Sequence, residues 1–166
     1  MIIITGFQLR AARRVLNLTF DQLTLDSQIS KVTLSRLENT ISNTEDITCS
    51  AKYAQALYDY FVKNNLSFPD KNTIQLNEHV EPRSIDNDIT RFQFLTARVA
   101  MNLSQKGLAE YTELKLGHGS YYRFEEQNNN CYLKSSKIKI NTLILFFKEH
   151  GVYFPNNQSV KIKNNS

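Results

Sequence analysis

The segment Lys31–Asn39 carries side chains that could make directional contacts with a polyanion. On a helix of 3.6 residues per turn, Leu34 and Leu37 fall on one face and the polar side chains on the other. Arginine and lysine can donate to guanine edges or phosphates, asparagine can pair with adenine, and valine can touch a thymine methyl. A solvated helix face would show the same pattern. The outward set is Lys31, Val32, Ser35, Arg36 and Asn39.

The surrounding sequence decides between these interpretations, because the chain repeats one pattern twice. Residues 4–13 (ITGFQLRAAR) return at residues 89–98 (ITRFQFLTAR), a shift of 85 positions that carries Phe7 to Phe92. A chain of 166 residues fits one ordinary domain or two small ones, and a repeat of this length favours two. We expect a first domain over residues 1–80, a linker over 81–88 and a second domain over 89–166.

Two short helix signals follow the repeated segment in each half. In the first half, Thr19 is the expected N-cap of a helix that reaches about Leu23, and Ser30 that of the helix over 31–39. Two short helices with a tight joint indicate a helix-turn-helix. The second half has its counterparts at residues 103–110 and 118–125, where Glu125 matches Glu38 at a shift of 87, so two residues are added near the joint.

On these residues the sequence resembles the lambda-repressor/Cro-like helix-turn-helix family, also called the XRE family. The resemblance rests on Thr-x-x-Gln-Leu-Arg-x-Ala-Arg at 5–13, Leu-Thr or Leu-Ser-Gln before the second helices, and Thr-Leu-Ser-Arg-Leu-Glu at 33–38. It covers most of residues 4–63 and, more loosely, 89–149. It implies a mainly α fold of two tandem helix-turn-helix domains. It also implies a bacterial or phage-type transcriptional regulator that binds sequence-specific double-stranded DNA, with third helices in the major groove.

The resemblance also implies which residues contact DNA. In the second half the outward face of the third helix is poorer in donors and carries Glu126, so one half is expected to read bases while the other grips the backbone or holds the pair together. Gln8 and Gln93 begin the first helices, where they are either phosphate contacts or solvated side chains. The candidate DNA-binding residues are Gln8, Ser30, Lys31, Val32, Ser35, Arg36, Asn39, Gln93, Gln105, Lys106, His118, Tyr122 and Arg123.

Two further features of the resemblance concern the fold and not DNA contact. Arg13 with Glu38, and Arg98 with Glu125, are expected to form ion pairs between the first and third helices, which would fix the angle of the third helix. At the helix-turn-helix joint the family usually has a glycine, whereas this chain has Gln28 in one half and a glutamate, Glu113, in the other. Neither residue takes a positive φ without strain, so the joint geometry is left open.

Each half continues with a long amphipathic helix, over about Ser50 to Asn65 and about Ser136 to His150. Alternating apolar residues around a Pro-Asp or Pro-Asn turn then predict hairpins over 66–76 and 152–162. Since a lone hairpin is marginal in water, we expect the hairpins to pack on the long helices, to pair with each other or to pair with another subunit. The aromatic residues of the long helices have core spacing, which favours packing over a stacking platform.

The amino-acid composition narrows the possible classes of protein. The net charge of +4 is a mild basic excess, and no apolar run reaches the ~20 residues that span a bilayer. Without an export signal, Cys49 and Cys131 are expected to be free thiols in the cytoplasm, where a regulator would associate with the nucleoid. The histidines form no metal-ligand spacing with the cysteines, and with 5 glycines the chain has no phosphate-cradling loop or nucleophile elbow. We expect no enzyme activity, no cofactor and no metal.

Two questions stay open at this level. The chain acts either as an intramolecular pseudo-dimer or as a homodimer through its hairpins or long helices. The alternative function is an interaction protein with a degenerate helix-turn-helix fold, such as an antitoxin-like neutraliser or an adaptor for RNA polymerase or another regulator, using the second half or the hairpins. An RNA-binding module lacks a recognisable motif.

Overall fold

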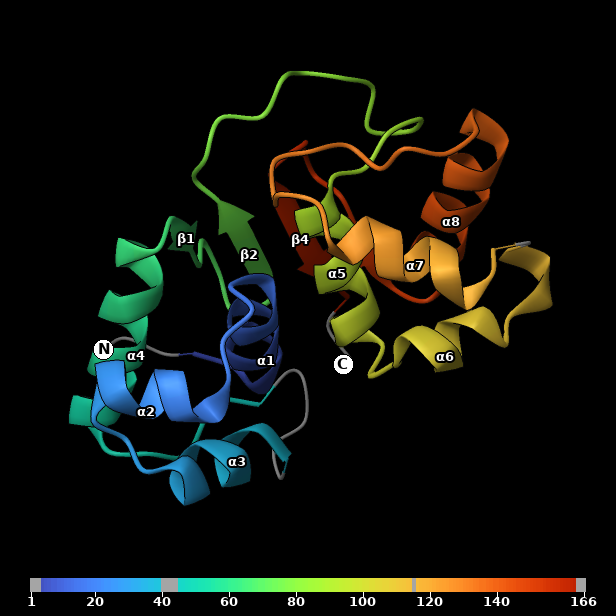
Figure 1. The fold of residues 1–166 in the computed structure, drawn as a ribbon. Helices are drawn as coiled ribbons and strands as arrows, with labels where there is room; N and C mark the ends of the chain where they lie inside the picture. The colour runs from blue at the N-terminus through green and yellow to red at the C-terminus, as the bar shows by residue number, and fades with distance from the viewer. Residues whose placement is uncertain (1–3, 40–44, 115, 164–166) are drawn as a thin grey trace.

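The computed structural model describes residues 4–39, 45–114 and 116–163, in which the chain is mainly helical with one small antiparallel sheet (Figure 1). The same order of elements occurs twice. The first half contains α1 (Gly6–Val15), α2 (Phe20–Ser27), α3 (Lys31–Asn39), α4 (Ala51–Lys63), β1 (Leu66–Ser67) and β2 (Thr73–Leu76). The second half contains α5 (Arg91–Ala100), α6 (Gln105–Ala109), the 3-10 helix η1 (Thr112–Leu114), α7 (His118–Glu125), α8 (Lys137–Glu149), β3 (Val152–Tyr153) and β4 (Ser159–Ile162).

Most helices begin at a residue whose side chain caps the first turn. Thr19 Oγ1 accepts from the backbone N–H of Gln22, and Ser30 Oγ accepts from that of Thr33 at 3.2 Å, so both predicted N-caps are confirmed. Ser50 and Ser136 cap α4 and α8 in the same way. These caps satisfy donors that the first turn of a helix leaves free, and they place the helix starts where the sequence predicts them.

The two hairpins form one sheet with the strand order β1-β2-β4-β3. Two of the three expected arrangements are therefore present, because the hairpins pair with each other and also pack on the long helices, where Phe61 contacts Phe68 and Phe147 contacts Phe154. Ile74 of β2 lies opposite Val160 of β4, its counterpart in the repeat, and the flanking pairs are arranged symmetrically around them. A pseudo-twofold axis consequently passes between Ile74 and Val160.

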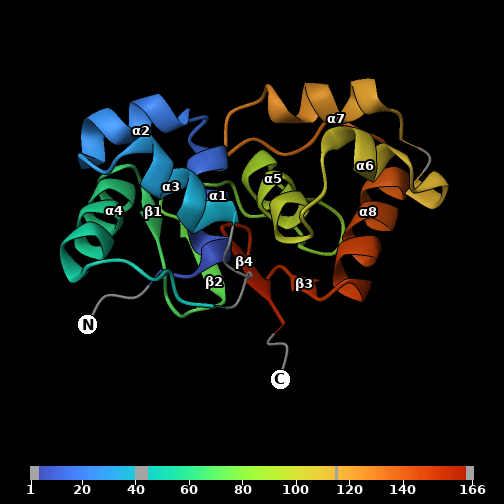
Figure 2. The same cartoon turned by 90° about the horizontal axis from the view of Figure 1, so that it is seen from below.

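The two halves share one hydrophobic core. The first helices of the two halves, α1 and α5, pack against each other over the sheet, and the equivalent residues Phe7 and Phe92 are both fully buried. Ile74 and Val160 reach the same core from the sheet. Seen from below in Figure 2, β2, β3 and β4 lie toward one edge of this assembly, and α2, α6 and α7 lie toward the opposite edge.

Arg91 ties the halves together at a point where the repeat is broken. It occupies the position that Gly6 has in the first half, and it is only 2% exposed. Its guanidinium donates to the carbonyl oxygen of Val15 at 2.8 Å, to Asn17 Oδ1 at 2.8 Å and to the carbonyl oxygen of Glu125 at 2.9 Å. A cation at the carbonyl end of α1 also complements the helix dipole.

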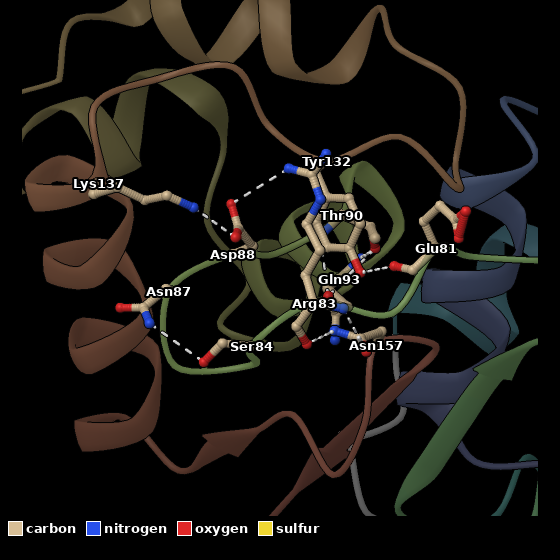
Figure 3. Close-up of polar contacts among 10 residues, drawn as sticks. All are labelled: Glu81, Arg83, Ser84, Asn87, Asp88, Thr90, Gln93, Tyr132, Lys137 and Asn157. Carbon is tan, nitrogen blue, oxygen red and sulfur yellow. Dashed lines mark hydrogen bonds and ion pairs between the residues drawn. The ribbon is translucent and has the colours of Figure 1, made fainter.

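The segment between the halves is fastened to the second half (Figure 3). Arg83 exchanges backbone hydrogen bonds with the side chain of Asn157, and its guanidinium lies 4.4 Å from the centre of the Tyr132 ring. Asp88 binds Lys137 at 2.6 Å, and Tyr132 donates its hydroxyl to the carbonyl oxygen of Glu81. The predicted linker over 81–88 is thus part of the folded second half.

The joints between the paired helices differ. Gln28 ends α2 with φ 58° and ψ 22°, a left-handed conformation, and its N–H donates to the carbonyl oxygen of Thr24. The joint of the first half therefore adopts a backbone that glycine takes most readily, despite the strain expected for glutamine. In the second half, Glu113 lies within η1, so the joint that carries the two added residues forms a 3-10 turn.

Candidate nucleic-acid interface

The outward face of α3 is open to solvent. Val32 is 80% exposed, while Leu34 and Leu37 are buried, which confirms the predicted division of the helix. Lys31, Arg36 and Asn39 are exposed, and Ser35 is half-buried. A shallow groove of about 530 Å³ runs along this face, lined by Phe20, Lys31, Val32, Ser35, Arg36 and Asn39. The helix thus offers cations, an amide and an apolar recess on one surface.

Lys31 forms an ion pair with Asp21 of α2. Its Nζ lies 3.0 Å from Asp21, and both side chains are more than half exposed. Exposed pairs of this kind contribute roughly 0–1 kcal/mol and are screened by salt. Lys31 can therefore leave Asp21 for a phosphate at little cost.

A buried ion pair in the first half and a partly buried one in the second fix the third helices. Arg13 Nη2 donates to Glu38 Oε2 at 2.9 Å, and its Nη1 donates to the carbonyl oxygen of Leu18 at 2.8 Å. Arg98 lies 2.6 Å from Glu125 and also donates to the carbonyl oxygen of Leu103. Both predicted ion pairs are confirmed. Because each carboxylate is paired, neither presents a free negative charge to an incoming polyanion.

The face of α7 has different chemistry. Tyr121 and Phe124 are buried, whereas Tyr122 is 53% exposed and His118 and Arg123 are also exposed, as the sequence predicted. A hydrogen bond to the Glu126 carboxylate raises the pKa of the Tyr122 phenol. Relative to Ser35 and Asn39 on α3, α7 therefore presents a tyrosine and a glutamate. It has fewer groups that pair with base edges.

A cationic cleft lies between α7 and the start of α8. It has a volume of about 430 Å³ and is lined by Ser120, Arg123, Phe124, Gln127, Lys134, Ser135 and Lys139, with no carboxylate among them. Within the described part of the chain, none of its three cations forms an ion pair. The first half has Thr48 and Tyr53 in place of the two lysines. Sequence analysis missed this cleft, although the lysines on both sides of the cap Ser136 were a visible signal.

A second cleft separates the two helix pairs. It has a volume of about 590 Å³ and is lined by Arg10, Arg14, Glu38, Asn39, Arg98, Val99, Asn102, Leu103, Ser104, Gln105, Lys106, His118 and Glu125. Partial burial lowers the pKa of both Arg10 and Arg14, and the neighbouring charge of Arg13 lowers that of Arg14 further. This cleft could not be predicted from the sequence, because its walls come from opposite halves of the chain.

The prediction that Gln8 and Gln93 contact phosphates is wrong. Both are fully buried. Gln8 accepts from the N–H of Thr5 and donates to the carbonyl oxygens of Asp70 at 2.6 Å and Thr73 at 2.9 Å. Gln93 makes the matching bonds to Thr90 and to the turn of the other hairpin. Their amides close capping boxes and hold the hairpin turns, which leaves no group for DNA.

The two candidates at the start of α6 differ in what they contact. Gln105 is half-buried and donates to Glu125 Oε2 at 2.9 Å, so its side chain helps to orient the ion pair with Arg98. Lys106 is exposed and lines the cleft between the helix pairs. Contact with a DNA backbone stays a prediction for both residues.

Most of the remaining candidates line three recesses. Asn39, Gln105, Lys106 and His118 line the cleft of about 590 Å³ together, although they come from opposite halves. Lys31, Val32, Ser35 and Arg36 line the groove along α3 with Asn39, and Arg123 lines the cationic cleft beside α7. Gln8 and Gln93 point instead toward the hairpins. Four of the thirteen predicted contact residues therefore share one cleft, and Asn39 belongs both to it and to the groove of α3.

Residues 4–39, 45–114 and 116–163 hold no cluster of three His, Cys, Asp or Glu side chains that could bind a metal ion. No helix in these ranges is long and apolar enough to cross a membrane. Cys49 and Cys131 are free thiols. Compared with protein families, curated proteins and solved structures, the chain gives no match.

Proposed function

We propose that this protein is a sequence-specific regulator that binds double-stranded DNA, built from two tandem lambda-repressor-like helix-turn-helix domains. The observation that carries the proposal is that α3 and α7 border one cleft between the two halves, lined by Asn39 and His118, at the ends of α1 and α5 that lie away from the hairpins. Symmetric repressor dimers bring two recognition helices to successive major grooves, about 34 Å apart, in this manner. We further propose that it acts in the cytoplasm, on the nucleoid.

The covalent link makes one chain the functional unit. Pairing of β2 with β4 and packing of α1 on α5 hold the halves in a fixed relation, as a dimer interface would. Once one helix pair has bound DNA, the other is presented at a high effective concentration. A homodimer is not needed for two-site binding.

In this proposal the two halves make different kinds of contact with DNA. The side chains of α3 have the chemistry to meet base edges, with Lys31 and Arg36 for guanine, Asn39 for adenine and Val32 for a thymine methyl. The second half supplies the cleft of Arg123, Lys134 and Lys139, whose unpaired cations suit phosphates. Phosphate contacts fix register and carry most of the salt dependence, while base contacts supply specificity.

The experiment is selection of bound sites from random duplex DNA with the full-length protein. We expect enrichment of one motif, loss of that motif for Arg36→Ala and for Val32→Ala, and an unchanged motif for Lys163→Gln. Lys163 is an exposed residue that follows β4 at the sheet end, so it serves as a charge-matched control. Failure to enrich any duplex over a random pool would refute the proposal.

A second candidate function is that of an interaction protein, either an antitoxin-like neutraliser or a polymerase-binding adaptor. It is favoured by exposed apolar side chains on the second half, namely Tyr122 on α7 and Ile138 and Leu145 on α8, of which Ile138 is 80% exposed. Ile138 and Leu145 stand seven residues apart and so share a helix face. Failure of DNA selection combined with loss of partner binding in Ile138→Lys would establish this function instead.

A further inference from the structure

Arg14 occupies the centre of the surface between the two helix pairs. It lies near the end of α1, and its counterpart in the repeat is Val99, near the end of α5. These two helices pack against each other beside the pseudo-twofold axis. Arg14 lines the cleft of about 590 Å³ with Ser104 and Lys106, and also a cleft of about 290 Å³ with Thr19 and Leu95. One side chain therefore borders the recesses on both sides of the axis.

The guanidinium of Arg14 makes no direct contact with a carboxylate in the described residues. Among residues 4–39, 45–114 and 116–163, its guanidinium forms no ion pair and no hydrogen bond. The two nearby carboxylates are already held, Glu38 by Arg13 and Glu125 by Arg98. The side chain is exposed, so its charge is available to a ligand.

The surroundings of Arg14 favour an added anion. Partial burial lowers its pKa and Arg13 and Arg98 lower it further, while Glu38 and Glu125, each held by one of those arginines, raise it. In the cleft of about 590 Å³ the cations Arg10, Arg14, Arg98 and Lys106 outnumber these two carboxylates. Crowding of like charges is relieved when an anion binds among them. A polyanion that spans the two helix pairs would bring such charge to the axis.

Duplex geometry specifies what would lie opposite Arg14. When two helices related by a twofold axis enter successive major grooves, the DNA surface on that axis is the intervening minor groove. Arginine is favoured in narrow A·T-rich minor grooves, where the negative potential is enhanced. The amino group of guanine at N2 projects into this groove, and A·T pairs lack it.

On the basis of the proposed function, we propose that Arg14 inserts into the minor groove at the centre of the bound site and selects A·T base pairs there. Because the twin position holds Val99, the centre is contacted from one side only. The DNA site is therefore not a palindrome, and the protein binds it in a single orientation. α3 covers one fixed end of the site and α7 the other.

The test uses the full-length protein and three versions of its selected site, with central A·T, G·C or inosine·C pairs. Inosine·C pairs keep the major-groove pattern of G·C but lack the minor-groove amino group. We expect the protein to bind the A·T and inosine·C centres about tenfold more tightly than the G·C centre, as for one lost base contact. Arg14→Val, which installs the residue of the other half, should bind all three centres equally and keep its preferences at outer positions.

Two further variants separate charge from shape. Arg14→Lys keeps the positive charge, so it should retain the salt dependence of binding while losing most of the discrimination at the centre. Lys163→Gln, at the sheet end, should change neither property. Thermal unfolding of each variant shows whether it is folded.

Several outcomes would overturn the inference. Suppose that Arg14→Val weakens binding by the same factor at all three centres and lowers the slope of log affinity against log salt by about one. Arg14 would then contact a phosphate and not the groove. If Arg14→Val keeps the preference for A·T centres, another residue reads the centre. If the unsubstituted protein binds no duplex at all, the proposed function itself has failed, which is a different result from either of these.

Discussion

The guanidinium of Arg91 donates a hydrogen bond of 2.8 Å to the carbonyl oxygen of Val15, the last residue of α1. The same side chain holds Asn17 of the first half and the backbone of Glu125 in the second. This contact breaks the internal symmetry, since the repeat has Gly6 at the matching position. Arg91 therefore joins the carboxyl end of α1 to the carboxyl end of α7.

Replacing Arg91 should destabilise the whole chain. In Arg91→Met the oxygens of Val15, Asn17 and Glu125 lose the guanidinium, although Asn129 still donates to Val15. Hydrogen bonds to a charged group contribute about 1.5–3 kcal/mol each, so we expect a loss of about 2–4 kcal/mol in the free energy of unfolding by urea. Arg123→Met removes an exposed arginine from a helix and should change stability by less than about 0.5 kcal/mol. Equal stability of the two variants would contradict the role assigned to Arg91.

The pair of Arg13 with Glu38 lends itself to a double-mutant cycle. Both side chains are less than a tenth exposed, so Arg13→Met should leave an uncompensated buried charge and cost about 3–5 kcal/mol. Arg13→Met combined with Glu38→Met removes both charges and should recover most of that loss. The cycle is measured by urea unfolding. If the double variant were as unstable as the two single losses added together, the two residues would not be coupled.

Tyr121 should make stability fall at alkaline pH. Its ring is fully buried and stacks on Phe94, and burial raises the pKa of its phenol to about 12, above the ordinary value near 10. Below pH 10 the phenol is neutral in both folded and unfolded chains. Between about pH 10 and 12 the unfolded chain ionises first, so stability is lost as pH rises through this window.

Tyr121→Phe isolates this effect. The variant should lose less stability than the parent between pH 9 and pH 11.5, measured as urea midpoints at both values. At neutral pH it should be at least as stable, since the Tyr121 hydroxyl is buried and has no hydrogen-bond partner in the described ranges. Tyr153→Phe changes an exposed tyrosine and serves as control. The same pH dependence in Tyr121→Phe and the parent would refute the assignment.

The cationic cleft of the second half should govern salt dependence and not sequence choice. Lys134→Gln with Lys139→Gln removes two proposed phosphate contacts, so the slope of log affinity against log salt should fall by about two. The selected motif should remain that of the unsubstituted protein. A changed motif with an unchanged slope would show that these lysines read bases.

Local patterns in the sequence were sufficient for the helices and their faces. The spacing of Leu34 and Leu37 predicted which side of α3 is buried, and the caps Thr19 and Ser30 predicted where helices start, because both depend on neighbours within one or two turns. The duplicated pattern likewise predicted two matching ion pairs. These features require no knowledge of distant contacts.

The features that the sequence did not predict depend on distant contacts or on competing local rules. Pairing of the hairpins was one of three alternatives that the sequence left open, and both the choice of β2 with β4 and the central position of Arg14 arise only when the halves are placed together. Thr5 and Gln8 match a capping-box spacing, which was the available sign that this glutamine is structural. Gln28 adopts a left-handed backbone because the joint between α2 and α3 demands it, which overrides the preference of the residue.

The most direct test of the account is a hydroxyl-radical footprint of the full-length protein on its selected DNA, with the mass of the complex measured in parallel. The account predicts one chain per duplex and two protected patches on one face of the DNA, about ten base pairs apart. A single protected patch, or two chains per site, would contradict the claim that one chain presents α3 and α7 to successive major grooves.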